Sequence, residues 1–283
     1  MNKYLITTFL ILCSLLCVKA FAQASTYHFD VQKSGNGKQA MIFIPGFACS
    51  ADVWKETIAT YNNEYTCYAL TMAGFAGTQP KSNASFNNWA TSIANFIKDA
   101  HIQKPILVGH SMGGALALAI AADHPDLISK IIVVDALPCL AALMNPSFKA
   151  KETNDCSAII DQLTKMTDEQ YYQLQKMSIP QLIADTTVHE DVISWSVLSD
   201  KKTVAEMFCD FSNTDLREKI KKIKCPSLIL LESYFVHVKT NIEEQYKHLN
   251  TAHIHYANKG LHFIMYDDKN WYFKQINNFL ATQ

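Results

Sequence analysis

A serine lies between two glycines at the point where an apolar strand-like run gives way to a helix-like run. The stretch reads Gly109-His110-Ser111-Met112-Gly113. The apolar run before it has strand length, and the alanine- and leucine-rich run after it has helix length. A turn this tight leaves no room for a Cβ beside the serine, so glycine is expected on both sides. The pattern predicts a serine hydroxyl held out for nucleophilic attack, rather than an idle serine on a glycine-rich loop.

A serine hydroxyl needs a base, and histidine is the natural one because its pKa lies near neutral pH. The chain has ten histidines. We select His262, because the loop after the last predicted strand brings it over the carboxyl edge of the sheet beside Ser111. His110 is adjacent to the serine, faces elsewhere and is expected to be structural. His253 and His255 alternate on one strand as a metal pair without a third ligand, so surface histidines are favoured there.

The elements that position these residues alternate between strand and helix from residue 40 onward. This order favours a mostly parallel, doubly wound α/β sheet with helices on both faces. A first strand at 27–32 is expected to form a hairpin with the strand at 40–44 through the turn at 34–37. Further strands are predicted at 65–70, 106–109, 128–134, 226–231 and 253–256, and helices at 86–100, 242–249 and 271–280.

The alternation stops between about residues 140 and 217. This stretch is polar, shows helical periodicity near 159–166 and 170–177, and has no convincing strand. We interpret it as a helical lid inserted after the strand that ends at Asp135, over the carboxyl edge of the sheet. The predicted organisation is a signal peptide at 1–22, the first part of the α/β core at 23–138, the lid at 139–217 and the second part of the core at 218–283.

The first residues are typical of a secretory signal peptide. Lys3 precedes an almost wholly apolar run from Leu5 to Val18, and Ala20-Phe21-Ala22 forms a cleavage site. An uncleaved membrane anchor is disfavoured, because the run is shorter than a bilayer-spanning helix needs. We therefore expect a secreted or periplasmic protein without stable membrane insertion after cleavage.

Composition narrows the classes of partner. The net charge is −1 and no long basic run is present, which argues against nucleic-acid binding and fits a small-molecule substrate. Six cysteines remain after signal cleavage, without a C-x-x-C pair or a zinc spacing, so no metal or cofactor is expected. Cys67 and Cys225 are predicted to be buried thiols. One disulfide is possible among Cys139, Cys156 and Cys209, but the sequence does not show which two are paired. The oligomeric state also stays open.

The order of these parts resembles the α/β-hydrolase family over nearly the whole chain after the signal peptide. The resemblance is carried by Ile44-Pro45-Gly46-Phe47, Gly109-His110-Ser111-Met112-Gly113-Gly114 and Leu261-His262-Phe263-Ile264-Met265-Tyr266-Asp267-Asp268. It implies a catalytic triad in the order serine, acid, histidine, and a lid after the strand that follows the nucleophile helix.

The acid of this triad departs from the usual family pattern. The commonest place is just after the strand at 227–231, but residues 232–237 contain no aspartate. Asp135 occupies an alternative place used by some members of the family and keeps the chain order. We favour Asp135 as the acid of the triad rather than as a residue that only caps a helix or turn, and Glu232 is the second choice for the acid. Asp267 and Asp268 are too close to His262 along the chain, and we predict that they cap the final helix.

The resemblance also implies where the oxyanion is bound. The backbone N–H of Met112, directly after the nucleophile, is one predicted donor, and the N–H of Phe47 is the second. An apolar acyl pocket is one interpretation of several large side chains, with core packing as an equal alternative. These side chains are Phe47, Phe75, Met112, Leu137 and Trp195.

The sequence thus predicts a serine hydrolase that cleaves a carboxylic ester or related acyl bond through an acyl-enzyme. Its substrate is expected to be a small acyl compound with an apolar portion. Within the enzymes, the alternatives are a thioesterase, an aminopeptidase or amidase, a carbon–carbon hydrolase and an acyltransferase. Outside them, the alternative is a non-catalytic binding protein that retains the fold.

Overall fold

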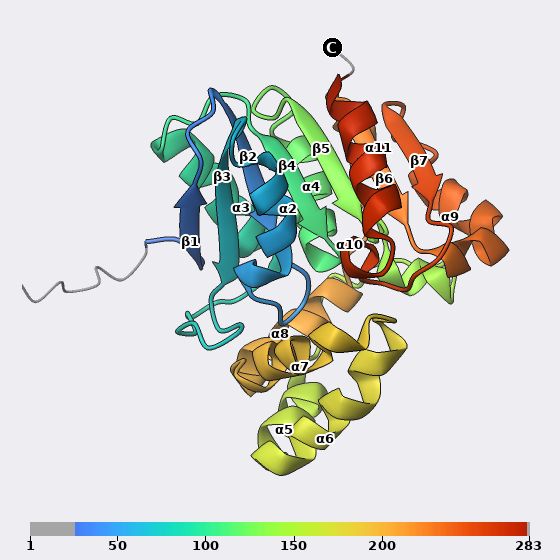
Figure 1. Cartoon of the computed structure of the whole chain (residues 1–283). Coiled ribbons are helices and arrows are strands. Elements are labelled where there is room, and N and C mark those ends of the chain that lie inside the picture. Colours follow the sequence, from blue (N-terminus) through green and yellow to red (C-terminus); the bar gives the residue numbers. More distant parts are fainter. Residues whose placement is uncertain (1–25, 282–283) are drawn as a thin grey trace, which may run out of the picture.

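A seven-stranded sheet forms the centre of the computed structural model, which describes residues 26–281 (Figure 1). The strands are β1 (Phe29–Ser34), β2 (Gln39–Ile44), β3 (Tyr65–Met72), β4 (Ile106–His110), β5 (Lys130–Val134), β6 (Ser227–Leu231) and β7 (Ala252–Tyr256). Their order in the sheet is β1-β3-β2-β4-β5-β6-β7, and every neighbouring pair is parallel except β1 with β3. The predicted mostly parallel α/β sheet is confirmed.

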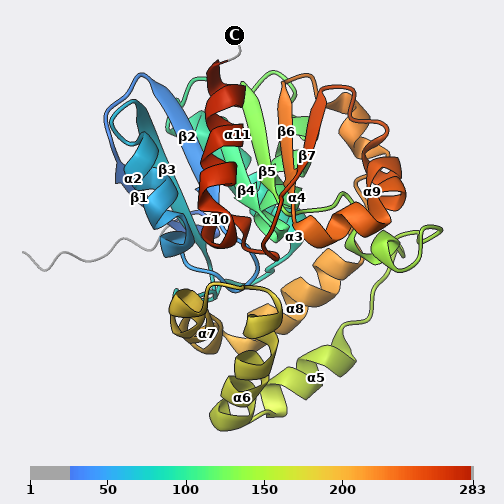
Figure 2. The same ribbon diagram turned by 45° about the vertical axis from the view of Figure 1, so that its right-hand side comes forward.

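Helices cover both faces of this sheet (Figures 1 and 2). The helices of the core are α2 (Lys55–Tyr61), α3 (Phe86–Asp99), α4 (Met112–Asp123), α9 (Lys239–Tyr246), α10 (Ile264–Asp267) and α11 (Lys269–Ala281). Trp89 of α3 and Leu116 of α4 belong to the buried cluster on one face. Trp54, just before α2, and Tyr272 of α11 belong to the cluster on the other. The two clusters fix the sheet from both sides, so its carboxyl edge is a rigid platform.

The predicted hairpin between the first two strands is wrong. β1 pairs antiparallel with β3, from Phe29 opposite Met72 to Ser34 opposite Cys67, whereas β2 lies between β3 and β4. The glycine-rich turn crosses the start of β3 instead. A Cβ on Gly35 would lie 2.2 Å from the carbonyl oxygen of Tyr65. Glycine is therefore required by this close crossing and by the positive φ of 72° at Gly35, not by a hairpin.

Between β5 and β6 the chain forms four α-helices at the carboxyl edge of the sheet (Figure 2). They are α5 (Ser157–Lys165), α6 (Asp168–Ser178), α7 (His189–Val197) and α8 (Lys201–Ser212). We call residues 140–217 the helical segment. No strand occurs in it, as expected from its periodicity. The proposed domain boundaries around it stay a prediction.

The helical segment is tied to the core by backbone hydrogen bonds. The N–H of Asp200 donates to the carbonyl of Gly74 at 2.7 Å, on the side of the loop after β3. On the other side, the N–H of Phe263 donates to the carbonyl of Leu182 at 3.2 Å. The part of the segment that contains α7 and α8 is thus hydrogen-bonded both to the loop after β3 and to the loop after β7.

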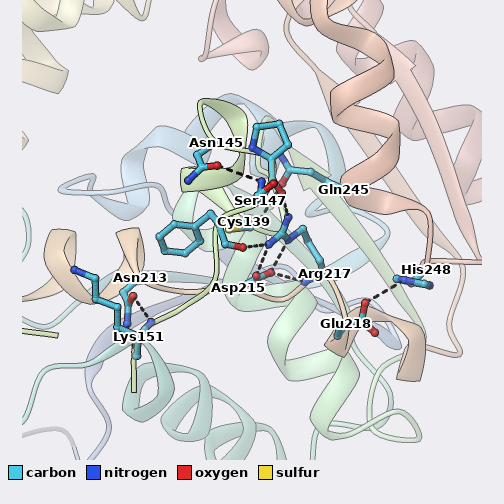
Figure 3. A network of polar contacts seen from close by, with 12 residues as sticks. Cys139, Asn145, Ser147, Lys151, Asn213, Asp215, Arg217, Glu218, Gln245 and His248 are labelled. Atoms are coloured by element: carbon cyan, nitrogen blue, oxygen red, sulfur yellow. Dashed lines mark hydrogen bonds and ion pairs between the residues drawn. The ribbon is translucent and has the colours of Figure 1, made fainter. Parts of the chain in front are cut away.

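A polar network joins the two chain stretches through which the helical segment leaves and re-enters the core (Figure 3). The guanidinium of Arg217 donates to both carboxylate oxygens of Asp215, at 2.9 and 2.6 Å. It also donates to the carbonyl oxygens of Pro146 and Phe148, at 2.7 and 2.5 Å. A bidentate Arg–carboxylate pair is geometrically specific, so Arg217 holds the outgoing stretch at 146–148 beside the returning stretch at 215–217.

A disulfide joins Cys156, just before α5, to Cys209 of α8, with Cα atoms 5.7 Å apart. This resolves the pairing that the sequence left open. The other described cysteines are free and buried: Cys49, Cys67, Cys139 and Cys225. The expected burial of the Cys67 and Cys225 thiols is confirmed. The signal peptide predicted at 1–22 lies outside the described residues. Among the described helices, none has the length and apolar character needed to cross a bilayer.

Candidate active site

Ser111 occupies a strained turn between β4 and α4. Its φ of 53° and ψ of −124° fall in a region that non-glycine residues rarely adopt. The turn is compact: a Cβ on Gly109 would lie 2.2 Å from the carbonyl oxygen of Gly113. A Cβ on Gly113 would in turn lie 2.3 Å from the carbonyl oxygen of Ile44. Both flanking glycines are therefore needed for close backbone approach, which is the physical basis of the sequence pattern.

His262 and Asp135 meet at the same edge of the sheet. His262 lies in the loop after β7, and Asp135 directly follows β5 with a φ of 48°. Nδ1–H of His262 donates to Oδ2 of Asp135 at 2.6 Å. Oδ1 of Asp135 accepts the backbone N–H of Glu232, also at 2.6 Å. The carboxylate is buried and both of its oxygens are engaged, so its orientation toward the imidazole is fixed.

Glu232, the second candidate for the acid, holds Asp135 through its backbone instead. Burial is the main cause that raises the pKa of its carboxyl to about 7, and the charge of Asp135 raises it further. Burial alone would lower the pKa of His262, but the hydrogen bond and charge of Asp135, together with the charge of Glu232, raise it above its ordinary value. The two carboxylates therefore favour the imidazolium form that a general base passes through.

His110 contacts the loop that carries His262, which we call the histidine loop. Its side chain is fully buried, and Nε2–H donates to the carbonyl oxygen of His262 at 3.0 Å. The two imidazole rings lie 4.7 Å apart. Burial, followed by the neighbouring charge of His262, lowers the pKa of His110 well below its ordinary value, so its ring is neutral. The structural role predicted for His110 fits this contact.

Two backbone N–H groups are free at the predicted oxyanion positions. Phe47 follows β2, and Met112 is the first residue of α4. Within the described part of the chain, neither N–H donates to a protein acceptor. Cys49 lies in the same loop as Phe47 and also lines the pocket over Ser111. Burial raises the pKa of the Cys49 thiol to about 12, so this thiol is not a competing nucleophile at neutral pH.

A pocket of about 420 Å³ lies over Ser111 and His262, between the sheet edge and α5–α8. This volume is in the range of small-molecule sites. The hydroxyl of Ser111 forms no hydrogen bond with any described residue, His262 included. Such a bond often tightens only when substrate binds. The structure thus brings Ser111, His262 and Asp135 to one edge, with the serine and histidine facing the same pocket.

The residues predicted to form the acyl pocket are divided by the structure. Phe47 lines the pocket, whereas Phe75, Met112 and Leu137 pack in the buried core. Trp195 packs against the core cluster on the other face. The actual walls come from pairs spaced four residues apart on α5, α6, α7 and α8. That spacing is visible in the sequence, but the face that turns toward the serine is decided by how the helices pack.

Asp267 and Asp268 are both predicted to cap the final helix, but only Asp268 lies at the residue before it. Asp268 directly precedes α11 and accepts the N–H of Tyr272 with its backbone carbonyl. Asp267 instead ends α10, and its carboxylate accepts the N–H of Leu261 at 2.8 Å. It also accepts the N–H groups of Ala184 and Asp185, each at 2.9 Å. Asp267 therefore joins the histidine loop to the helical segment.

Comparison with known proteins agrees with this architecture. Residues 39–166 match the model of the "alpha/beta hydrolase fold" family. The pimeloyl-[acyl-carrier protein] methyl ester esterase of Vibrio cholerae is 25% identical over 202 residues, which cover 70% of this chain and 76% of that protein. The corresponding enzyme of Proteus mirabilis is 24% identical over 200 residues, with 70% and 76% covered.

Solved structures show the same fold. The esterase of Thermogutta terrifontis superposes with a TM-score of 0.73 at 17% identity, covering 89% of this chain and 92% of that one. The enol-lactonase of Burkholderia xenovorans also gives 0.73, at 15% identity, covering 89% and 96%. These two similarities are structural and concern the fold alone. With the sheet order, the serine turn and the family match taken together, this chain is a hydrolase with the α/β-hydrolase fold.

Proposed function

We propose that this protein hydrolyses a carboxylic ester of a small molecule through an acyl-enzyme formed on Ser111. The observation that carries the proposal is the 2.6 Å contact between His262 and the buried Asp135, beside a serine held in a strained turn. Relatives named as methyl ester esterases support ester hydrolysis as the reaction. A non-catalytic binding protein, which is the alternative, would not require a strained serine turn beside a buried Asp–His pair.

In the proposed first step, Ser111 Oγ attacks the ester carbonyl while Nε2 of His262 takes the hydroxyl proton. Asp135 keeps the proton on Nδ1 and stabilises the imidazolium by its charge. The carbonyl oxygen becomes an oxyanion, which accepts hydrogen bonds from the N–H groups of Phe47 and Met112. Each preorganised donor of this kind contributes about 3 kcal/mol to the transition state.

The tetrahedral intermediate then breaks its bond to the alcohol oxygen, which receives the proton from His262 and leaves. In the second step, water gives a proton to His262 and adds to the acyl-serine carbonyl. The bond to Ser111 Oγ breaks, Oγ regains its proton, and the carboxylic acid is released. The two halves use the same residues in the same roles, so the chain needs no further group for the reaction.

A fluorophosphonate probe tests the proposal directly. We expect one adduct on the purified protein, located on Ser111 by mass spectrometry, and loss of both labelling and ester turnover in Ser111→Ala. Ser147→Ala is the matched control because Ser147 is exposed and does not line the pocket. Substrates are a panel of small oxygen esters with matched thioesters and amides. The proposal fails if the probe does not label the protein or if labelling persists in Ser111→Ala.

A further inference from the structure

We propose that the pocket over Ser111 binds an uncharged, amphiphilic ester. The apolar chain of the substrate lies against α5 and α8, and a neutral hydrogen-bonding group, such as a hydroxyl or a carbonyl, is bound by Tyr171 and Ser196. This inference rests on the proposed function and specifies its substrate class. It assigns Tyr171 and Ser196 as residues that determine specificity.

The pocket has two chemically different walls. One is apolar and comes from two packed helices, with Ile159 and Leu163 on α5 and Phe208 on α8. The ring of Phe208 makes an edge contact with Phe47 at 5.8 Å between centroids, which brings this wall to the predicted oxyanion loop. An alkyl chain attached to an acyl group on Ser111 therefore meets apolar surface from its first carbons onward.

The other wall comes from α6 and α7, which also pack together, and it carries hydroxyl groups. Tyr171 is only 2% exposed and Ser196 only 5% exposed, and both line the pocket. Among the described residues, neither hydroxyl has a hydrogen-bond partner. Gln175 lies one turn beyond Tyr171 on the same face of α6 and its side-chain amide is likewise unpartnered within the described chain.

Both hydroxyls are open to the pocket rather than enclosed by protein, and a hydrogen bond from a ligand to such a group contributes about 0.5–1.5 kcal/mol. Two such hydroxyls on one wall of a substrate pocket therefore point to a ligand group that satisfies them. Ser178, the remaining hydroxyl on this face of α6, donates to the carbonyl of Leu174 at 2.8 Å and is already satisfied. On the wall formed by α6 and α7, the polar side chains without a partner among the described residues are therefore Tyr171, Gln175 and Ser196.

The charge of the bound group follows from what the pocket lacks. No Asp, Glu, Lys or Arg side chain lines it in the described structure. The ammonium of Lys201 lies 5.8 Å from the centre of the Tyr171 ring, but it is paired with Asp168 at 2.7 Å. A carboxylate or ammonium at the end of the substrate would be buried without a counter-ion, at a large cost. A neutral polar group pays no such cost.

The test compares p-nitrophenyl hexanoate and octanoate with their ω-hydroxy counterparts, and with the ω-carboxy hexanoate. The readout is the ratio of kcat/KM for each hydroxy ester to that of its parent. We expect this ratio to fall about fivefold in Tyr171→Phe and in Ser196→Ala, the size of one lost hydrogen bond. We expect the ω-carboxy ester to be about a hundredfold poorer than the ω-hydroxy ester in the wild type.

Tyr172→Phe is the matched control. Tyr172 neighbours Tyr171 on α6 but does not line the pocket, and its ring contacts Lys176. The ratio should not change in this variant. An unchanged ratio in both Tyr171→Phe and Ser196→Ala, or an ω-carboxy ester cleaved as well as the hydroxy ester, overturns the inference.

A binding measurement separates this inference from the proposed function. Methyl hexanoate and methyl 6-hydroxyhexanoate are titrated against Ser111→Ala by calorimetry, with and without Tyr171→Phe. Tighter binding of the hydroxy ester that is lost with Tyr171→Phe supports the inference even if no ester is hydrolysed, a result that would overturn only the proposed function. Equal binding of the two esters overturns the inference even if hydrolysis is observed.

Discussion

The pairing of His262 with Asp135 makes the identity of the acid testable at single residues. Asp135→Asn keeps the shape of the side chain but removes the charge that holds the Nδ1–H tautomer. We expect kcat/KM to fall strongly, toward the loss of about 10⁴ that the equivalent change causes in the serine-protease template. Glu232→Gln keeps the backbone N–H that donates to Asp135, so it should cost less than about tenfold in comparison. Steady-state kinetics of both variants, with circular dichroism as the control for folding, decide the question, and the reverse order of effects would make Glu232 the acid.

The pH dependence of activity follows from the raised pKa of His262. The base must be neutral to accept the serine proton, so kcat/KM should decrease as the pH falls through a pKa above the ordinary 6.5 of histidine. The charge of Glu232 contributes to this increase. Removing that charge in Glu232→Gln should lower the pKa of His262 and move the acid limb of the profile to lower pH. A profile measured from pH 5 to 9 checks both statements, and an acid limb that moves to higher pH in the variant would contradict the electrostatic origin.

The sequence predicts residues of the candidate site best where the chemistry is local. Ser111 lies at the centre of a five-residue pattern, and close backbone contacts require the glycine at each end of it. His262 can be selected because a loop after the last strand must lie at the sheet edge. The choice between Asp135 and Glu232 is different, because β5 and β6 are neighbours and end at the same edge. Only the backbone conformation at Asp135, with its φ of 48°, turns that carboxylate toward the imidazole, and no local pattern encodes it.

At the level of elements, α5 is joined covalently to α8 by the disulfide. None of its residues is fully buried, although Ile159 and Leu163 form part of a pocket wall. The disulfide from Cys156 fixes the start of α5 against α8, whose other contacts anchor it to the core. By contrast, α7 and α8 are held by backbone bonds on both sides. The disulfide is therefore the covalent support of the apolar wall.

Removing this disulfide should loosen the wall without disturbing the catalytic residues. In the double variant Cys156→Ser, Cys209→Ser we expect KM for long-chain esters to rise more than KM for acetate esters, with kcat little changed. We expect stability to decrease by up to about 4 kcal/mol, the chain-entropy value for a loop of this length. Kinetics over a series of chain lengths and denaturant unfolding measure the two effects. Added reductant should reproduce them in the wild type and have no effect on the double variant, and an equal change in KM for all chain lengths would contradict a role in the pocket.

The helical segment also shows which structural features can be predicted from sequence patterns. Its helices are expected from their periodicity, but the pairing of α5 with α8 and of α6 with α7 depends on long-range packing. The same is true of β1, whose partner is β3 and not the strand that follows it. Alternation of apolar residues describes each strand by itself and contains no information on its neighbour. The glycines at 35 and 37 are compatible with both a hairpin and a crossing, and only the assembled sheet distinguishes them.

On the scale of the whole molecule, the disulfide and the predicted signal peptide favour the same compartment. Disulfides persist in oxidising environments, and Cys156 and Cys209 form one. Within residues 26–281 the four free thiols are all buried, which protects them from oxidation or exchange. The apolar run between Leu5 and Val18 with the Ala20-Phe21-Ala22 site is the pattern from which we predict a secretory signal peptide. We therefore propose that the protein matures outside the cytoplasm and folds there with its disulfide formed.

This proposal predicts both the start of the mature chain and the state of its cysteines. Expressed with residues 1–22 included in a Gram-negative host, the protein should be recovered from the periplasm or the medium with Gln23 as its first residue, because the small side chains of Ala20 and Ala22 fit the signal peptidase. A thiol reagent added under denaturing conditions should label Cys49, Cys67, Cys139 and Cys225 but spare Cys156 and Cys209. Ala20→Arg with Ala22→Arg should block cleavage and leave the precursor uncut. An intact N-terminus on active protein in the cytoplasm, with all its cysteines labelled, would refute export, and the support that α5 receives from the disulfide would then be lost in the cell.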